Sequence, residues 1–168
     1  MSNQIKPCHL PDIFEVWEIV KSCSNWLASK GMNHWTKDYD VETIQQKFRE
    51  TTVFGFLENN VINGVISLST KPPIYYNKED FSHFQDPNAK SFYVSMLAVR
   101  PELHRKGIAS QLMTFVEETA GKYNIPFVRL MHMEPCEELN KFYTKRNYNL
   151  THTRDDEENL MNFYEKKI

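Results

Sequence analysis

With 168 residues, the chain has the length of one domain with a substantial core, and its 40% apolar and 13% aromatic content is ordinary for a folded protein. Twenty Lys and Arg residues against 22 Asp and Glu residues give a formal charge of -2, which argues against nucleic acid or an anionic membrane as a partner. No apolar run approaches the roughly 20 residues that span a bilayer, and the first residues lack a secretory signal. We therefore expect a single cytoplasmic domain over residues 1–168.

The first half of the chain reads as a short strand, two helices and a hairpin. Pro11 and Asp12 open an amphipathic helix that places Ile13, Val16 and Val20 on one face. A loop rich in aromatic and polar groups follows this helix. The expected elements are a strand over 5–8, helices over 12–27 and 41–49, and strands over 53–57 and 61–68, joined by Glu58-Asn59-Asn60.

Residues 71–90 interrupt this alternation. The segment is too long for a tight turn and too aromatic for a linker, so we expect it to pack as a functional loop. The chain then resumes regular structure, with a hairpin at its end. The expected elements are a central strand over 91–99, a helix over 107–122, a strand over 127–131, a helix over 137–146, and strands over 148–153 and 160–165 around a polar turn at 154–159.

The most informative stretch is Val94–Met113, in which an apolar strand leads into the basic turn His104-Arg105-Lys106-Gly107 and then into a helix. The start of a helix leaves several backbone N–H groups without intrahelical partners and carries partial positive charge. Such a turn binds phosphates through the main chain, and Gly107 lets the backbone approach them closely. The sequence therefore predicts a pyrophosphate site here.

The three cysteines, Cys8, Cys23 and Cys136, are scattered along the chain without metal-ligand spacing. We expect them to be reduced thiols. No group of His, Cys and carboxylate residues has ligand spacing either, so no metal site is expected.

The order of elements and the turn motif resemble those of the GCN5-related N-acetyltransferases (GNAT), which transfer an acetyl group from acetyl-CoA to an amine. That family has Arg/Gln-x-x-Gly-x-Gly/Ala after a strand, and this chain has His104-Arg105-Lys106-Gly107-Ile108-Ala109. The segment 140–148 resembles a second conserved segment, with Asn147-Tyr148 in place of the usual Gly-Phe. The resemblance implies an α/β fold with a mixed, mostly antiparallel sheet of six to seven strands, about four flanking helices and a splay between strands 4 and 5.

The same resemblance implies that acetyl-CoA is the co-substrate. Its implied contacts lie on the end of the fourth strand, the phosphate turn, the start of the next helix and the second conserved segment. The implied cofactor-binding residues are Leu97, Ala98, Val99, His104, Arg105, Lys106, Gly107, Ile108, Ala109, Ser110, Asn140 and Tyr143. His104 departs from the usual Arg or Gln, but most phosphate contacts are expected from backbone N–H groups.

The reaction needs an acceptor for the proton of the amine, a donor for the developing oxyanion and a donor for the leaving thiolate. By the resemblance, the backbone N–H of Leu97 serves the oxyanion and Tyr143 serves the thiolate. Full proton transfer from a phenol with pKa near 10 to a thiolate whose conjugate acid has pKa near 8.5 costs roughly 2 kcal/mol. Hydrogen bonding from Tyr143 therefore matters as much as proton delivery.

The base is open, because the glutamate of some relatives is Tyr93 here. Tyr93 and Ser95 share strand parity with Leu97 and are candidates to hold a relaying water. His132 and Glu134 are alternative acceptors, and an ordinary structural role remains open for all four residues.

The acceptor pocket is predicted near the end of the first helix. Trp26, His34 and Trp35 fall where relatives often shape this pocket, and aromatic faces bind cations. A core role for the two Trp residues is the alternative. The acceptor itself remains open between small amines and peptide amines.

Two functional hypotheses follow from these predictions. The first is an acetyl-CoA-dependent N-acetyltransferase, and the second is a CoA-binding regulatory or catalytically inactive domain of the same fold. A homodimer through exposed strands near the C-terminal hairpin is a further hypothesis.

Overall fold

The computed structural model describes residues 4–33, 35, 39–133, 135–156 and 159–168. Seven strands form one sheet in the order β1-β2-β3-β4-β5-β7-β6. The pairs β1–β2, β2–β3, β5–β7 and β6–β7 are antiparallel, and β4–β5 is parallel. The predicted mixed, mostly antiparallel α/β fold is confirmed.

The chain divides into two compact units, which are described separately. The first unit comprises residues 1–69 and 96–116, and the second comprises 70–95 and 117–168. Strand β4 (Ser91–Val99) and helix α5 (Ile108–Lys122) each contribute residues to both units.

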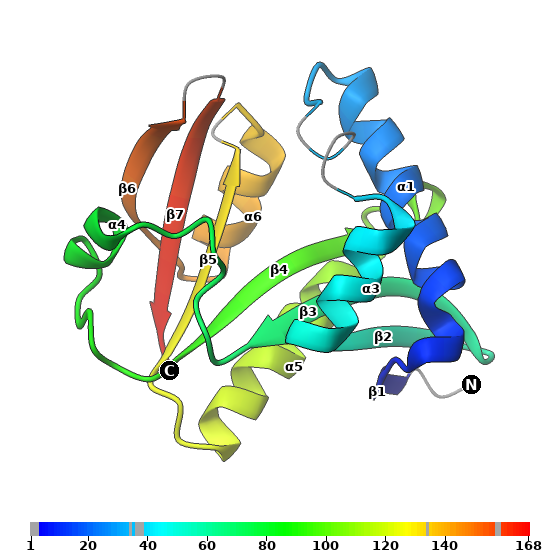
Figure 1. Cartoon of the computed structure of the whole chain (residues 1–168), viewed down its shortest axis with the longest axis horizontal. Helices are drawn as coiled ribbons and strands as arrows, with labels where there is room; N and C mark the ends of the chain where they lie inside the picture. Colours follow the sequence, from blue (N-terminus) through cyan, green and yellow to red (C-terminus); the bar gives the residue numbers. More distant parts are fainter. Residues whose placement is uncertain (1–3, 34, 36–38, 134, 157–158) are drawn as a thin grey trace. The chain divides into compact units, whose positions relative to one another are not determined.

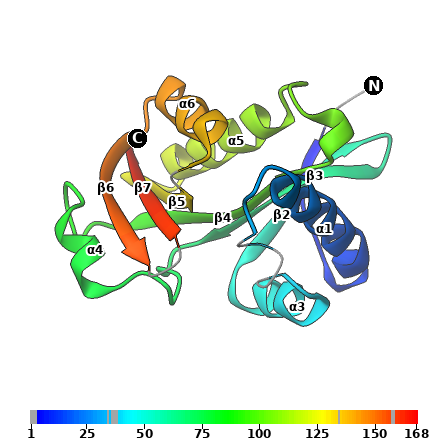
Figure 2. The same ribbon diagram turned by 90° about the horizontal axis from the view of Figure 1, so that it is seen from above.

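In the first unit, two helices cover one face of the strands and the beginning of α5 covers the other face (Figures 1 and 2). The unit contains β1 (Gln4–Pro7), α1 (Ile13–Ser29), α3 (Val41–Glu50), β2 (Thr52–Glu58) and β3 (Val61–Ser69). The side chain of Asp40 accepts a hydrogen bond of 2.7 Å from Thr43 N and so caps α3.

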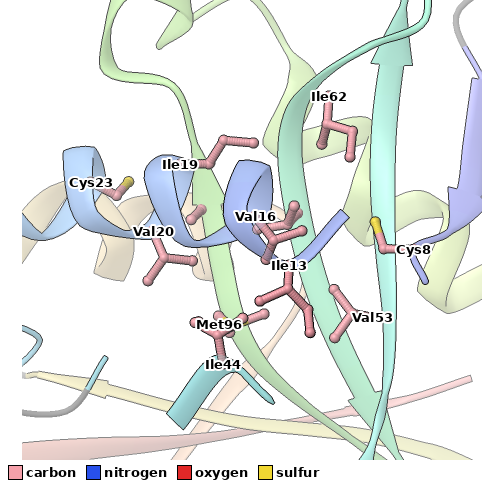
Figure 3. Packing of buried hydrophobic residues seen from close by; sticks show 12 residues of the cluster. Cys8, Ile13, Val16, Ile19, Val20, Cys23, Ile44, Val53, Ile62 and Met96 are labelled. Carbon is pink, nitrogen blue, oxygen red and sulfur yellow. The ribbon is translucent and has the colours of Figure 1, made fainter. Parts of the chain in front are cut away.

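The core of this unit lies between α1, α3 and the strands (Figure 3). The apolar positions of α1 recur at helical spacing, and Val16, Ile19 and Val20 are fully buried against Ile44 and Val53. Burial of one such side chain contributes about 2 kcal/mol. The amphipathic pattern of the sequence therefore positions α1 on the sheet.

Gly64 of β3 allows the first turn of α5 to approach the strand. A Cβ atom on Gly64 would lie 2.9 Å from Ile108 Cγ2 and 3.3 Å from the carbonyl oxygen of Ala98. We expect Gly64→Val to lower the free energy of unfolding by about 1–3 kcal/mol through overpacking. Gly121→Ala is the control, since a Cβ there lies 3.8 Å from its nearest neighbour in Ile168.

Chemical denaturation checks this prediction. Gly121 lies inside α5, so its replacement by alanine should leave stability unchanged or raise it by up to about 1 kcal/mol. Equal effects of the two substitutions would show that the contact between Gly64 and Ile108 does not limit the packing of α5.

The second unit is built on β5 (Phe127–Met133), β6 (Asn149–Asp156) and β7 (Asn159–Lys167), with α4 (Lys78–Ser82) and α6 (Glu137–Lys145) (Figure 1). Arg129 pairs with Glu165 across β5 and β7, and His132 pairs with Asn162. Because side chains alternate along a strand, Arg129 and His132 lie on opposite faces. The first face carries α4, and the second carries α6.

A buried arginine anchors the segment 70–90 on the α4 face. Arg129 is 0% exposed and donates from Nε to Glu165 Oε2 at 2.8 Å, from Nη1 to Tyr93 Oη at 3.2 Å and from Nη2 to Asp86 O at 2.6 Å. Glu165 also accepts a hydrogen bond from Gln85 N at 2.9 Å. These contacts satisfy the buried charge, since an unpaired buried guanidinium is costly.

A second polar cluster fixes the same segment through α4. Asp80, which is 1% exposed, accepts hydrogen bonds from His152 Nε2 at 2.9 Å and from Arg154 Nη1. Arg154 Nη2 also donates to the carbonyl oxygen of Tyr75 at 3.0 Å. The predicted packing of residues 71–90 is confirmed, while their functional role stays a prediction.

Most predicted elements are confirmed, and β4 has the predicted bounds Ser91–Val99. Strand β5 continues to Met133, two residues beyond its predicted end, and the larger differences lie elsewhere. Helix α1 continues to Ser29, and the segment 71–90 contains α4. Strand β6 extends to Asp156 and β7 begins at Asn159, so both strands include residues that were predicted to form the turn. Cross-strand hydrogen bonds hold the polar ends of β6 and β7 in the sheet, and the strand propensity of these residues alone does not predict such bonds.

Strand β4 carries a local irregularity just before Leu97. Met96 has φ 54°, a value that non-glycine residues rarely adopt and that marks an interrupted pleat. The parallel register with β5 runs from Ser91–Phe127 to Val94–Leu130. The sequence predicted that the side chains of Tyr93, Ser95 and Leu97 lie on the same face of the strand. This alternation of side chains is interrupted at Met96.

Among the described residues, no helix has the length and apolarity of a membrane-spanning segment.

Candidate functional site

The predicted phosphate turn belongs to the first unit and is held by its own backbone. The short helix η2 (Pro101–Leu103) follows β4, and its turn is closed by hydrogen bonds from His104 N to Pro101 O at 3.2 Å and from Lys106 N to Leu103 O at 3.4 Å. Arg105 and Gly107 have φ values of 64° and 83°. These two left-handed residues reverse the chain into α5.

The start of α5 provides the groups that an anion needs. Gln111 N donates to Gly107 O at 3.0 Å, which is the first helical hydrogen bond. The N–H groups of Ile108, Ala109 and Ser110 precede it and have no acceptor within the helix, as the geometry of a helix start requires. Among the described residues, a Cβ on Gly107 would meet no atom within 4 Å. The backbone at Gly107 is therefore open to solvent.

The imidazole of His104 is turned back toward the strand. Its Nε2 lies 2.9 Å from the carbonyl oxygen of Val99, and its ring contacts that of Trp26 edge to face at a centroid distance of 4.6 Å. Cys23 Sγ donates to the same carbonyl at 3.4 Å. His104 is thus placed in the turn as predicted, but its side chain contacts protein groups.

The residues predicted on β4 are placed in order at its end. Leu97 is half-buried, whereas Ala98 and Val99 are buried. Arg100 N donates to Asn63 O at 3.0 Å, and Arg100 Nε donates to Ile62 O at 3.1 Å, which holds the end of β4 against β3. The backbone of Leu97 follows the irregularity at Met96 directly.

Tyr143, the predicted thiolate partner, is buried in the second unit. It lies on α6 and packs against His132 at a ring-centroid distance of 5.5 Å, Tyr164 at 5.7 Å and Tyr148 at 5.8 Å. Burial raises the pKa of the Tyr143 hydroxyl, and nearby Cys136 and Tyr164 act in the same direction. The phenol is therefore neutral throughout the physiological range and can donate a hydrogen bond.

The two ring nitrogens of His132 have different surroundings. Its Nδ1 lies 2.8 Å from the carbonyl oxygen of Met133 and must carry the proton, because a carbonyl only accepts. Its Nε2 is buried and has no hydrogen-bond partner among the described residues. Burial lowers the pKa of His132 to about 4. Neutral His132 therefore presents an acceptor atom beside Tyr143 but is a weak base.

We expect His132 to make stability depend on pH. The unfolded chain binds this proton near the ordinary pKa of 6.5 and the folded chain near 4, so stability is retained above pH 6.5 and falls between these values as pH decreases. Full protonation of His132 lowers the free energy of unfolding by about 3 kcal/mol. Urea unfolding from pH 7.5 to pH 4.5 measures it, with His132→Asn as the control that does not titrate. If the free energies of unfolding of the wild type and of His132→Asn differed by the same amount at every pH in this range, the lowered pKa of His132 would be contradicted.

Asn140 and Tyr143 share one face of the second unit. Asn140 Oδ1 accepts hydrogen bonds from Asn162 Nδ2 at 3.1 Å and from Tyr164 Oη at 3.0 Å. The ring of Tyr164 also stacks on His132 at a centroid distance of 5.2 Å. Tyr164 therefore contacts three residues that the sequence analysis named, Asn140, His132 and Tyr143, although no pattern in the sequence singled out Tyr164 itself.

Tyr93 lies on the opposite face of these strands. Its hydroxyl accepts the hydrogen bond from Arg129, and its ring meets that of Tyr76 at a centroid distance of 5.4 Å. Ser95 shares a hydrogen bond with Tyr75. The structure thus separates Tyr93 from Tyr143 within the second unit. The role of Tyr93 in a proton relay stays a prediction.

The predicted acceptor-site residues are placed in part. Trp26 lies in the last two turns of α1, half-buried, with Lys30 Nζ 4.3 Å from the centre of one of its rings. Trp35 packs on the core of the first unit and contacts Tyr39 at a centroid distance of 5.0 Å. His34 and Glu134 lie outside the described residues. A cation of the chain itself thus already lies over Trp26.

Sequence reasoning did not single out Arg129, Glu165 or Gly64. A charged residue inside the apolar run Phe127–Met131 and a Glu inside the final strand were available signals for the buried ion pair. The need for glycine at position 64 had no comparable signal, because it depends on where α5 packs.

Comparison with known proteins identifies the family. Residues 20–148 match the family model of the acetyltransferase (GNAT) family. The chain belongs to this family. Its members are N-acetyltransferases in general, and the match includes the phosphate turn, α6 and Tyr143.

Solved structures share the fold. A GNAT-family acetyltransferase from Listeria monocytogenes has a TM-score of 0.76 at 19% identity, with 99% of this chain and 95% of that chain covered. The PaiA N-acetyltransferase from Thermoplasma acidophilum, solved in complex with coenzyme A, has a TM-score of 0.75 at 18% identity over 100% of both chains. A GNAT acetyltransferase from Elizabethkingia anophelis with acetyl-CoA bound has a TM-score of 0.68 at 14% identity, covering 99% and 98%.

One sequence match is partial. Eighty residues, or 48% of this chain, are 35% identical to a tropinone reductase homolog from Arabidopsis thaliana, and they cover only 29% of that protein. The chain therefore spans less than a third of that relative, and no activity is inferred from it. Among the described residues, no group of three or more His, Cys, Asp or Glu side chains is arranged to hold a metal ion.

Proposed function

We propose that this protein is an acetyl-CoA-dependent N-acetyltransferase that transfers the acetyl group to an amine by direct attack in a ternary complex. The observation that carries the proposal is the start of α5, where Gly107 opens onto free space and three backbone N–H groups lack helical acceptors. Partial positive charge at a helix start favours a diphosphate there. Members of the same fold from Thermoplasma acidophilum and Elizabethkingia anophelis bind coenzyme A and acetyl-CoA, which supports this choice.

The backbone carries the cofactor contacts in this proposal. Ile108, Ala109 and Ser110 donate N–H groups to the diphosphate, while Arg105 and Lys106 supply local positive charge. The N–H of Val99 is assigned to the pantetheine arm, since its carbonyl already accepts from His104. The N–H of Leu97 is assigned to the carbonyl oxygen that becomes negative during attack.

Tyr143 is assigned to the leaving thiolate, and its raised pKa refines this role. A phenol that is a weaker acid than usual holds its proton more firmly against a thiolate whose conjugate acid has pKa near 8.5. Tyr143 therefore stabilises the thiolate mainly by donating a hydrogen bond, and the proton on the product thiol comes finally from solvent.

The proton of the amine needs a different acceptor. His132, with a pKa of about 4, is neutral at pH 7 but too weak a base to keep a proton taken from an ammonium group with pKa near 10. We propose that the amine loses its proton to the buffered solvent before it attacks, in the fraction set by its own pKa, and Tyr93 stays a predicted relay residue. Trp26 and Trp35 remain the proposed acceptor-side residues within the described chain.

Thiol release provides the test. Purified protein is incubated with acetyl-CoA and a panel of polyamines, aminoglycosides, amino acids and peptides with free N-termini or lysines, and free CoA is measured with a thiol reagent. Amine-dependent release supports the enzyme. Tight CoA binding without turnover across the panel would favour a CoA-binding regulatory domain.

The proposal extends to the organisation of the molecule. We propose one acetyltransferase domain over residues 1–168, acting in the cytoplasm on a small-molecule or peptide amine. The homodimer stays a prediction, which sedimentation would test.

A further inference from the structure

His104 contacts two different parts of the first unit. Its Nε2 lies 2.9 Å from the carbonyl oxygen of Val99 at the end of β4, and its ring meets Trp26 near the end of α1. The next residue, Arg105, has φ 64° and begins the reversal into α5. His104 thus joins the phosphate turn to both a strand and a helix.

The hydrogen bond to Val99 fixes the tautomer of His104. A carbonyl oxygen only accepts, so Nε2 must carry the proton. The thiol of Cys23 donates to the same oxygen at 3.4 Å, and burial raises the pKa of this thiol, which keeps it protonated. The carbonyl at the end of β4 therefore has two side-chain donors, of which His104 is the shorter contact.

The contact with Trp26 reaches a helix that carries a predicted acceptor-side residue. The two rings are nearly perpendicular, at 86°, in the edge-to-face arrangement that aromatic groups favour. Lys30 occupies a neighbouring part of the indole at 4.3 Å. A movement of His104 therefore changes the surroundings of Trp26 directly.

We propose that His104 is a positioning residue that orders the phosphate turn through Val99 and transmits occupation of this turn to Trp26 on α1. The inference rests on the proposed function, because it takes the turn to be the CoA site. It also explains why the imidazole can replace the Arg or Gln usual at this position, since its action is on the protein and the phosphates are bound by the main chain.

Two substitutions separate the two contacts. His104→Gln keeps an N–H donor, because Gln Nε2 lies the same number of bonds from Cα as His Nε2, but removes the ring. His104→Phe keeps a ring for Trp26 but removes the donor. A purely structural role predicts that both variants lose stability and that neither contact has a separate effect on CoA.

The experiment combines calorimetry with fluorine NMR. Protein containing 5-fluorotryptophan at Trp17, Trp26 and Trp35 is titrated with CoA, and the signal of Trp26 is assigned with Trp26→Phe. Trp17 and Trp35 are internal controls. CoA affinity is measured on the same samples, and thermal unfolding verifies that each variant is folded.

We expect CoA to shift the Trp26 signal of the wild-type protein. His104→Gln should bind CoA within about twofold of wild type with the Trp26 shift lost. His104→Phe should bind about five- to tenfold more weakly, as for one lost hydrogen bond, and should still shift Trp26 at saturation. Wild-type affinity in His104→Phe or an unchanged Trp26 shift in His104→Gln would overturn the inference.

Three further outcomes, all measured on the wild-type protein, also decide the inference. In the wild-type protein, nitrogen NMR must show a proton on Nε2 of His104, and an Nε2 without a proton would overturn the inference even if a variant failed to fold. A wild-type protein that binds CoA without any change at Trp26 overturns this inference alone. A wild-type protein that binds no CoA overturns the proposed function as well.

Discussion

Gly107→Glu will abolish CoA binding while the protein stays folded. The residue has φ 83° and faces open space at the start of α5, so a side chain there extends to where the diphosphate is proposed to lie. Its carboxylate repels that anion and competes for the same N–H groups. Calorimetric titration with CoA measures the effect, and circular dichroism verifies the fold.

Gly107→Gln is the matched control. Both side chains have nearly the same size, and both are strained at a left-handed position by about 1–2 kcal/mol. Only the charge differs. We expect the Gln variant to keep measurable CoA affinity. An equal loss of CoA affinity in both variants would show that the added side chain and its backbone strain cause the effect and that the charge does not. Wild-type affinity in a folded Gly107→Glu protein would remove the phosphate site from this turn.

Tyr143→Phe will lower the rate of acetyl transfer at least tenfold. The substitution removes the only polar atom of the side chain and keeps the ring that packs against His132, Tyr148 and Tyr164. A tenfold loss corresponds to about 1.4 kcal/mol of transition-state stabilisation, which a hydrogen bond to a developing thiolate supplies. Thiol release at saturating acetyl-CoA measures it, with the amine found in the panel.

Tyr148→Phe provides the control for loss of a buried phenol. Tyr148 contacts the ring of Tyr143, but its own hydroxyl donates to Glu117 at 3.3 Å. We expect its rate to stay within about threefold of wild type. CoA affinity should change by no more than about threefold in either variant, because a thiol sulfur is a weak hydrogen-bond acceptor and the bond from Tyr143 strengthens as the thiolate forms. Equal rates for Tyr143→Phe and wild type would leave Tyr143 with a structural role.

The pKa values restrict how the proton can move. The phenol of Tyr143 has a raised pKa and His132 has a pKa of about 4, so both are neutral at pH 7. Neither group changes its charge between pH 6 and pH 9 by its own titration. Titration of these two groups therefore does not account for a rise in rate over this range, whereas deprotonation of the amine itself would produce one.

Local sequence patterns predicted much of the fold. The amphipathic spacing of Ile13, Val16 and Val20 places α1 on the sheet, and the apolar run Ser91–Val99 gives β4 its bounds. The turn at Gly107 was also predictable, because a positive φ and a helix start need a particular residue at a particular place. Each of these signals depends on neighbours close in the chain.

The surroundings of the site residues were not predictable in this way. Tyr93 was selected by its distance in sequence from Leu97, but it bonds to Arg129, and the pleat is interrupted at Met96. His104 was predicted to belong to the cofactor-binding turn, and the sequence did not predict that its Nε2 lies 2.9 Å from the carbonyl oxygen of Val99. A buried polar side chain points toward its hydrogen-bond partner, and that partner can come from any part of the chain.

Local patterns in the sequence were enough to predict most of the elements, their order, the family and the glycine turn before α5, since periodicity and φ requirements act over a few residues. The contacts of the folded chain were needed to show that Arg129 is buried with Glu165, that His132 Nε2 has no hydrogen-bond partner among the described residues and that Gly64 must be small. These properties depend on burial and on contacts between segments distant in sequence, which determine the cost of a charge, a proton or a methyl group at each position.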